Sequence, residues 1–271
     1  MKIDMHCHVK EGSPDSKVSL DEYITILKAN GFEGMLITDH DTYKGYRYWK
    51  NKMKGKSHED FVVLKGIEYD TCDAGHIIVI MPEGVKMRLL ELKGLPVSVL
   101  IDFVHRHGGV LGPAHPCGEK YMSFTNTKRF YKNPEIIKRF DFIEVFNACE
   151  SMESNEKAAK LAYKYQKVGI GGSDAHRPMA YTDLPERVTC ETELISLIRK
   201  KVPLEVGGML YNKTTKEKLG KANKILVYSF WIYNKTGGLI KRSKRKRKSM
   251  LENPIDPIDP IEMEYLANYK R

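Results

Sequence analysis

The sequence predicts an α/β fold of the β/α-barrel kind, and three observations support this class. Apolar segments typical of strands alternate with helical segments over residues 1–190. Short polar clusters lie beside the strand segments, where the loops of a β/α barrel build its functional site. The length of 271 residues suits one such barrel with a small appendage.

The first half of the chain begins with a strand at Lys2–Cys7. Ser19-Leu20-Asp21-Glu22 is a capping box, because a serine and a glutamate at this spacing satisfy the free amides of a first helical turn. It opens a helix that runs to about Ala29 and stops at Asn30-Gly31. Three buried strands follow at residues 34–38, 61–64 and 77–80.

The second half continues the alternation. Pro96 opens a helix that ends at Gly108-Gly109, since proline suits the first helical turn and glycine its end. We expect strands at residues 110–114, 142–146 and 168–172, and an amphipathic helix at residues 153–167. Strands separated by helices indicate a parallel sheet.

Composition divides the chain into three parts. Residues 1–190 form the barrel, residues 191–240 add a closing helix at about 191–200 and a small cap, and residues 241–271 form a tail. The run from Lys241 to Lys248 holds seven Lys or Arg and no acid, so the net charge of +10 reflects this tail more than the body. A Pro-Ile-Asp repeat follows, and we expect an extended or disordered tail.

The sequence contains no apolar run long enough for a membrane span and no apolar signal region at its start. We therefore expect no membrane association and a cytoplasmic location. The five cysteines are widely spaced, never form Cys-x-x-Cys, and fit reduced thiols.

Histidines and carboxylates gather in the short polar clusters. His6 and His8 place both rings on one face of a strand, because strand side chains alternate. The further clusters are Asp39-His40-Asp41, Gly66-Ile67-Glu68, Gly75-His76, Ala114-His115-Pro116 and Ser173-Asp174-Ala175-His176. Imidazoles and carboxylates in this mixture suit zinc, manganese or iron.

At these motifs the sequence resembles the polymerase-and-histidinol-phosphatase (PHP) family. The resemblance covers roughly residues 1–190 and includes His-x-His, the aspartate of Ser13-Pro14-Asp15-Ser16, Thr-Asp-His, Gly-Ile-Glu, Gly-His, Ala-His-Pro and Ser-Asp-Ala-His, in that order. It implies a distorted seven-stranded (β/α) barrel that binds two or three divalent metal ions.

The resemblance also implies nine ligands in three sites. The first site takes His6, His8, Glu68 and Asp174. The second site takes Glu68, which bridges to the first, with His76 and His115. The third site takes Asp15, His40 and His176, and Glu11 is the rival of Asp15. Asp39 and Asp41 are candidates to orient the ligating imidazoles.

With such metals, Glu68 and Asp174 are the catalytic residues and a metal-bridging hydroxide is the nucleophile. The resemblance favours the branch that hydrolyses phosphoesters of nucleotides or short oligonucleotides. Arg177, which directly follows a candidate ligand, and Asn147, which follows the strand at residues 142–146, are the candidate substrate-binding residues. Three alternatives stay open. They are a histidinol-phosphate or other small-metabolite phosphatase, a nucleic-acid-binding accessory protein acting through weak contacts of the basic tail, and a metal-binding protein without catalysis.

Overall fold

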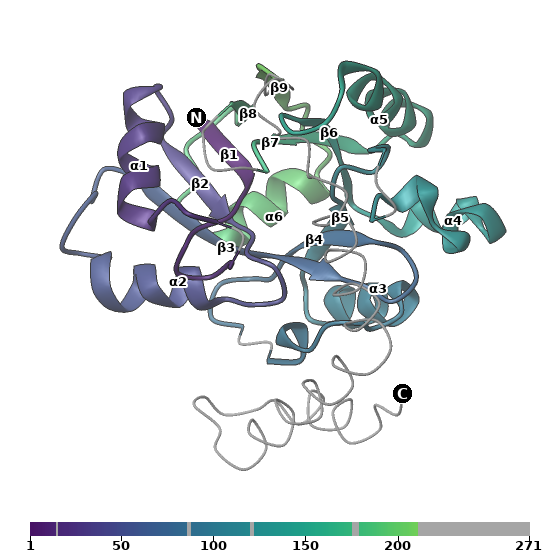
Figure 1. Cartoon of the computed structure of the whole chain (residues 1–271), viewed down its shortest axis with the longest axis horizontal. Coiled ribbons are helices and arrows are strands. Elements are labelled where there is room, and N and C mark those ends of the chain that lie inside the picture. The colour runs from purple at the N-terminus through teal and green to yellow at the C-terminus, as the bar shows by residue number, and fades with distance from the viewer. Residues whose placement is uncertain (15, 86–87, 120–121, 175–178, 211–271) are drawn as a thin grey trace, which may run out of the picture. The chain divides into compact units, whose positions relative to one another are not determined.

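A computed structural model describes residues 1–14, 16–85, 88–119, 122–174 and 179–210 (Figure 1). The chain separates into two compact units, one of Met1–Val85 with Gly94–Tyr211 and one of Lys86–Lys93 with Asn212–Arg271. The described part of the second unit contains the 3-10 helix Arg88–Glu91. The predicted tail lies outside the described residues. All other described helices and strands belong to the first unit.

A seven-stranded sheet forms the centre of this unit, in the order β5-β4-β3-β2-β1-β8-β9. Its strands are β1 Lys2–Cys7, β2 Gly34–Ile37, β3 Val62–Asp70, β4 His76–Ile80, β5 Val110–Pro113, β8 Ala180–Asp183 and β9 Glu205–Gly208. The pairs β1/β2 and β2/β3 are parallel, whereas β3/β4, β4/β5, β1/β8 and β8/β9 are antiparallel.

The prediction of a parallel sheet is therefore wrong for these four pairs. Only residues 71–75 separate β3 from β4, which is too short for the crossover that parallel strands need. The antiparallel turn has a consequence for the site, because it brings His76 at the start of β4 beside Asp70 at the end of β3.

Two further strands, β6 Phe142–Asn147 and β7 Val168–Gly172, form a separate parallel pair. The amide of Asp141 donates to the carbonyl of Leu111 in β5, and the amide of Asp174 donates to the carbonyl of His6 in β1. The pair is thus tied to β5 and to β1. The α/β class is confirmed, and the large sheet is a curled half-barrel. A complete seven-stranded barrel remains a prediction.

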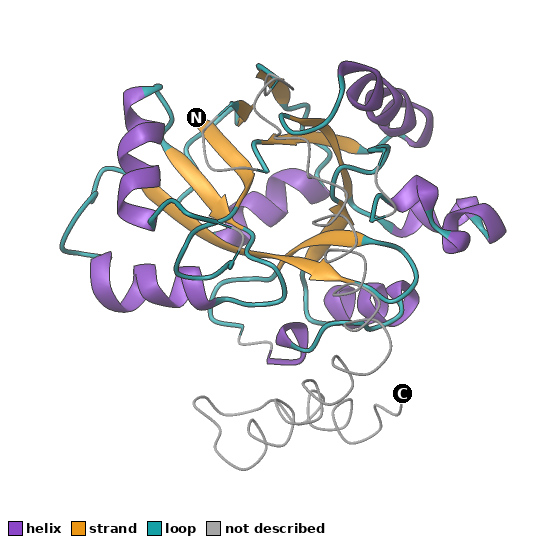
Figure 2. Cartoon of the chain, viewed as in Figure 1, coloured by secondary structure: helices purple, strands orange, loops and turns teal. Residues whose placement is uncertain are grey.

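Helices surround the strands (Figure 2). The α-helices of this unit are α1 Leu20–Ala29, α2 Lys44–Tyr48, α3 Val97–Arg106, α4 Lys128–Lys132, α5 Met152–Tyr165 and α6 Glu191–Arg199. A π-helix covers Trp49–Met53, and 3-10 helices cover Phe124–Asn126 and Pro134–Arg139. The hydroxyl of Ser19 accepts from the amide of Glu22, which confirms the predicted cap of α1. None of the described helices is long and apolar enough to cross a membrane.

The core lies on both faces of the sheet. Leu36 of β2 belongs to a cluster with Ile3 of β1 and Leu194 of α6, whereas its neighbours Met35 and Ile37 pack with α1. Helices on both faces explain why the strands read as continuous apolar runs.

The register of β1 against β2 shifts between Asp4 and Cys7. Such a bulge changes which way the following side chains point. The Asp4 carboxylate accepts from the Tyr23 hydroxyl of α1 over 2.8 Å, while His6 and His8 point to Glu68. Because of this irregularity in β1, the side chain of Asp4 points to α1, whereas those of His6 and His8 point to Glu68.

Candidate metal centre

Glu68 lies near the end of β3 at the centre of five imidazoles, and its side chain is 0% exposed. The distances from its Oε2 are 3.4 Å to His6 Nε2, 3.3 Å to His8 Nε2 and 3.0 Å to His40 Nδ1. The distances from its Oε1 are 2.9 Å to His76 Nδ1 and 3.1 Å to His115 Nε2. One carboxylate thus has a separate group of imidazoles at each of its oxygens.

Asp174 adds a second carboxylate from the segment after β7. Its Oδ1 lies 3.4 Å from His6 Nε2 and 3.2 Å from His8 Nε2. Its Oδ2 lies 4.0 Å from His115 Nε2. His6 and His8 therefore face both Glu68 and Asp174, which is the arrangement that a shared cation requires.

The chain reaches this cluster through backbone that is uncommon for residues with side chains. His115 has φ 30°, Asp174 has φ 47° and Asp41 has φ 51°, all in the left-handed region. Such conformations cost about 1–3 kcal/mol each and tend to collect at functional sites. Asp41 also accepts from the Asp70 amide over 2.9 Å, which links the β2 end to the β3 end.

Electrostatics bind the cluster together. Burial alone would lower the pKa of His8, but hydrogen bonds with Asp174 and Glu68 raise it to about 10. Burial likewise opposes the charged form of His115, and Glu68 and Asp174 raise its pKa to about 9. Burial would raise the pKa of Glu68, yet the histidines, with His76 and His40 first, hold it well below its usual range.

The donor set fits divalent metal ions. Ligand atoms of His6, His8, Glu68 and Asp174 all lie within 4.8 Å of one another, and the same holds for His40, Glu68 and His76. His6 Nε2 is buried and has no hydrogen-bond partner among the described residues, although it faces Glu68 Oε2 over 3.4 Å. A cation between them would satisfy both atoms, since buried polar atoms rarely lack partners.

Glu144, in β6, belongs to the site although the motifs do not include it. Its Oε1 accepts from His6 Nδ1 over 3.0 Å, so the other ring nitrogen of His6 is directed at Glu68 and Asp174. Its Oε2 accepts from the backbone amide of His115. The sequence contained one signal for this role. Glu144 is a carboxylate inside the apolar strand Phe142–Asn147, where a buried charge needs a partner.

Two aspartates support the loops around the cluster. Asp4 accepts from the amides of His6 and Ser173, and burial raises its pKa to about 6. Asp39 accepts from the amide of Val9, and burial likewise raises its pKa to about 6. Asp39 was predicted to orient an imidazole. In the structure Asp39 also hydrogen-bonds to the side chain of Ser13, whose hydroxyl lies 3.5 Å from His8 Nδ1, so its link to an imidazole is indirect.

Asn147 is 1% exposed, at the end of β6. Its Nδ2 donates to Glu144 Oε2 and to Asp174 Oδ2, both over 3.1 Å. Its Oδ1 accepts from the Cys149 amide over 2.9 Å. These contacts connect Asn147 to the carboxylates of the cluster, while its predicted role in binding substrate stays a prediction.

The third predicted site cannot be followed in the same way. Asp15, His176 and the substrate candidate Arg177 lie outside the described residues. His40, predicted for that site, lies beside Glu68 and His76. Glu11, the rival of Asp15, accepts from the Leu20 amide over 3.0 Å at the start of α1. The division of the nine predicted ligands among three ions stays a prediction.

Comparisons with known proteins agree with this geometry. Residues 152–203 match the family model for PHP-associated sequences. A candidate metal-dependent phosphoesterase from Bifidobacterium adolescentis has a similar structure, with a TM-score of 0.52 and 17% identity, over 73% of this chain and 96% of that one. No curated protein sequence matches the chain.

Two other solved structures share the fold. Endonuclease Q, in complex with a 27-mer duplex that carries an abasic lesion at its active site, has a TM-score of 0.56 and 16% identity, over 77% of this chain and 60% of that one. An amidohydrolase from Chromobacterium violaceum with bound sulfate has a TM-score of 0.51 and 15% identity, over 72% of this chain and 96% of that one.

The fold is similar to that of solved metal-dependent phosphoesterases, and the histidine–carboxylate cluster offers a donor set that could hold divalent metal ions. The resemblance to the PHP family that the motifs indicated is confirmed, and the fold of the chain is of the PHP type.

Proposed function

We propose that the chain hydrolyses phosphomonoesters of nucleotides or short oligonucleotides, with two or three divalent ions of manganese, zinc or iron. The observation that carries the proposal is the position of Glu68, whose two carboxylate oxygens face two different groups of imidazoles. A carboxylate in this position suits a bridge between two cations, which is the usual core of a two-metal phosphoesterase site.

The residues present divide naturally around that bridge. His6, His8 and Asp174 would hold one ion with Glu68 Oε2, because their ligand atoms lie within 4.8 Å of one another. His76 and His115 would hold a second ion with Glu68 Oε1. His40 lies next to both groups and would belong with Asp15 and His176 in a third site. Bound divalent ions supply an activated water and positive charge for the phosphoryl oxygens.

The protein itself supplies position and orientation. Glu144 fixes the proton of His6 on Nδ1, so Nε2 is left to act as a ligand. Asn147 donates to Asp174 Oδ2, which leaves Oδ1 directed at His6 and His8. Burial of Glu68 and His6 lowers the local dielectric constant and strengthens each of these interactions.

The proposed substrate class follows from the likeness to endonuclease Q. Endonuclease Q, which shares the fold, is seen with a DNA duplex at its active site. That relationship favours a nucleotide-containing substrate over a small metabolite. Arg177 would supply a guanidinium for the phosphate at the rim of the cluster, because it directly follows Asp174-Ala175-His176 in the sequence.

The experiment is a substrate panel with separate reconstitution by manganese, zinc and iron. The panel contains a nucleoside monophosphate, a 5′-phosphorylated dinucleotide and histidinol phosphate. We expect turnover of the first two to exceed that of the third. Faster turnover of histidinol phosphate would shift the proposal to the small-metabolite alternative, and inactivity on the whole panel with every metal would reject it.

Glu68→Gln tests the centre of the mechanism. The substitution keeps the shape of the side chain and removes its charge, so we expect turnover to fall by about three orders of magnitude, equivalent to about 4 kcal/mol. Glu59→Gln is the matched control, because Glu59 is exposed and outside the cluster. Equal activities of the two variants would exclude Glu68 from the reaction.

A further inference from the structure

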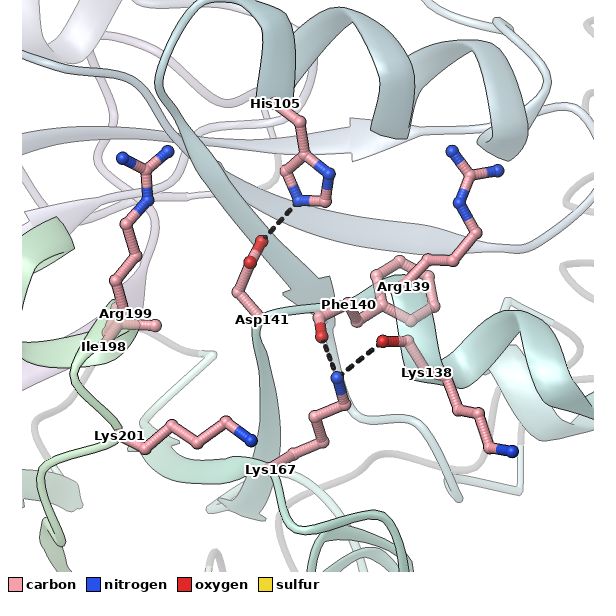
Figure 3. A pocket seen from close by; sticks show the side chains of 9 residues that line it. All are labelled: His105, Lys138, Arg139, Phe140, Asp141, Lys167, Ile198, Arg199 and Lys201. Atoms are coloured by element: carbon pink, nitrogen blue, oxygen red, sulfur yellow. Dashed lines mark hydrogen bonds and ion pairs between the residues drawn. The ribbon is translucent and has the colours of Figure 1, made fainter.

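A pocket of about 330 Å³ lies away from the metal cluster, at the opposite ends of β6 and β7 (Figure 3). Asp141 directly precedes β6 and Lys167 directly precedes β7, whereas Asn147 and Asp174 lie at or beyond the far ends of these strands. A strand of this length spans roughly 15–20 Å. The pocket is therefore separate from the site around Glu68.

The lining of this pocket is strongly basic. Two of its lining residues, Phe140 and Ile198, are buried and apolar. His105 and Asp141 also line it, and their side chains are paired over 2.9 Å. The remaining lining residues are the five cations Lys138, Arg139, Lys167, Arg199 and Lys201.

These cations come from two sides of the hollow, as Figure 3 shows. Lys138 and Arg139 end the 3-10 helix Pro134–Arg139, while Arg199 and Lys201 lie at the end of α6. Lys167 lies between them and donates from Nζ to the carbonyl oxygens of Lys138 and Phe140, over 2.7 and 2.5 Å. In the figure the ammonium groups of Lys167 and Lys201 point into the hollow, whereas the charged ends of Lys138 and Arg139 extend away from its middle.

Nearby carboxylates do not balance this charge. Lys138 pairs with Glu135 and Arg139 pairs with Asp102, and Asp141 is engaged by His105 and by the Leu111 amide. Among the described residues, the contacts of the five lining cations and of His105 thus involve three carboxylates, and Arg199 donates to the Gly109 carbonyl over 3.3 Å. The pKa of Lys167 is lowered, first by burial and also by the charge of Lys201, although Asp141 partly opposes the effect. The pocket is electropositive without a ligand.

Lys201 is the residue with the clearest unused charge. Its side chain is exposed, and within the described residues it has neither an ion pair nor a hydrogen bond. Its backbone amide donates to the Ile198 carbonyl over 3.0 Å, with φ 53°, so the residue is held at the end of α6 by its main chain. The ammonium group is therefore available to a ligand in the hollow.

We propose that this pocket binds a small anion with two or more linked phosphates, such as inorganic pyrophosphate or the phosphate tail of a nucleotide. The volume lies at the lower end of the range for small-molecule sites, which suits such a group. Two ammonium groups, those of Lys167 and Lys201, point into the hollow, and two such groups suit the several negative charges of linked phosphates better than the charge of a single phosphate. Nucleic acid is a less suitable ligand, because a duplex requires an extended basic surface rather than a hollow.

The test is calorimetric titration of pyrophosphate into the full chain and three variants. Lys201→Glu reverses the charge in the pocket. Lys200→Glu makes the same change at the adjacent exposed residue, which does not line the pocket. Lys201→Gly removes the charge and suits the positive φ, so it does not depend on a variant that folds poorly. Any binding at the Glu68 cluster is common to all four proteins and cancels in the comparison.

We expect pyrophosphate binding at the pocket to weaken about tenfold or more in both Lys201 variants, because a charged contact is lost. Lys200→Glu should stay within about twofold of the wild type, since its charge is farther from the hollow. Equal affinities of Lys201→Glu and Lys200→Glu would overturn the proposal. The proposal would also be overturned if Lys201→Glu weakened the binding of a short DNA duplex and left the binding of pyrophosphate unchanged.

Discussion

Nδ1 of His6 donates to Oε1 of Glu144 over 3.0 Å, and both side chains are fully buried. This contact turns Nε2 of the same ring towards Glu68 and Asp174, each 3.4 Å away. Glu144 also accepts from the amide of His115. A single carboxylate from β6 therefore orients parts of the cluster that come from β1 and from the end of β5.

The first prediction concerns this carboxylate. Glu144→Gln keeps the shape but leaves one acceptor oxygen for the three donors His6, His115 and Asn147, so at least one of them loses its partner. We expect metal affinity to fall about 10–100-fold, the usual effect of removing such a supporting contact. Competition with a chromophoric chelator measures it. Glu153→Gln on the surface of α5 is the control, and equal affinity of both variants would contradict the orienting role.

The second prediction concerns pH. In the metal-free cluster the pKa of His8 is about 10 and that of His115 about 9, so both rings carry protons at neutral pH. Each bound ion must displace those protons. Metal affinity should therefore rise steadily from about pH 6 to about pH 9, with protons released to the buffer. Calorimetry in buffers of different ionisation enthalpy detects this proton release. A metal affinity that does not change with pH, with no proton release, would contradict the raised pKa values of His8 and His115.

The third prediction concerns Gly172 at the end of β7. A Cβ at this position would collide with the Cβ and backbone of His6. We expect Gly172→Ala to lower the free energy of unfolding by about 1–3 kcal/mol and to weaken metal binding. Gly31→Ala is a useful comparison, because its Cβ would meet nothing but its φ is 74°. That variant should cost about 1 kcal/mol and leave metal binding intact.

The fourth prediction distinguishes two roles of Asn147. If its amide mainly positions Asp174, Asn147→Ala lowers metal affinity, because Asp174 Oδ2 loses a donor. If it mainly binds substrate, KM rises while metal content stays unchanged. The buried contacts with Glu144 and Asp174 favour the first result. Metal content and KM measured on the same preparation decide between the two.

The fifth prediction concerns Arg177. As a phosphate anchor, Arg177→Ala should raise KM more than it lowers kcat, at a cost of about 1.5–3 kcal/mol. Arg177→Lys should recover only part of the loss, because a point charge does not copy the planar guanidinium. Steady-state kinetics on the best phosphoester test both. Kinetics equal to wild type in Arg177→Ala would remove the residue from substrate binding.

Much of the fold was predictable because its signals are local. The cap at Ser19, the proline and glycines around α3 and the apolar strands all act over a few residues. The positions of His6, Glu68 and Asp174 at strand ends were predictable for the same reason. The antiparallel β3/β4 turn was missed because the prediction followed the commoner strand–helix–strand connection.

The role of Glu144 depended on tertiary structure. A carboxylate inside an apolar strand either faces solvent or is buried against a partner. The alternation of side chains along the strand does not by itself distinguish these two cases. Its partner His6 is 138 positions away along the chain. The shift of register in β1, which separates Asp4 from the two histidines, likewise depends on pairing with β2.

The sequence by itself determined which residue types stand at the strand ends, and therefore the class of chemistry. Only the tertiary structure decided which of them meet, so that five imidazoles surround Glu68 and five cations line a separate pocket. The physical reason is that local propensity depends on neighbours along the chain, whereas charge interactions depend on distance in space. Residues such as Lys138 and Lys201 become neighbours only after the strands between them have packed.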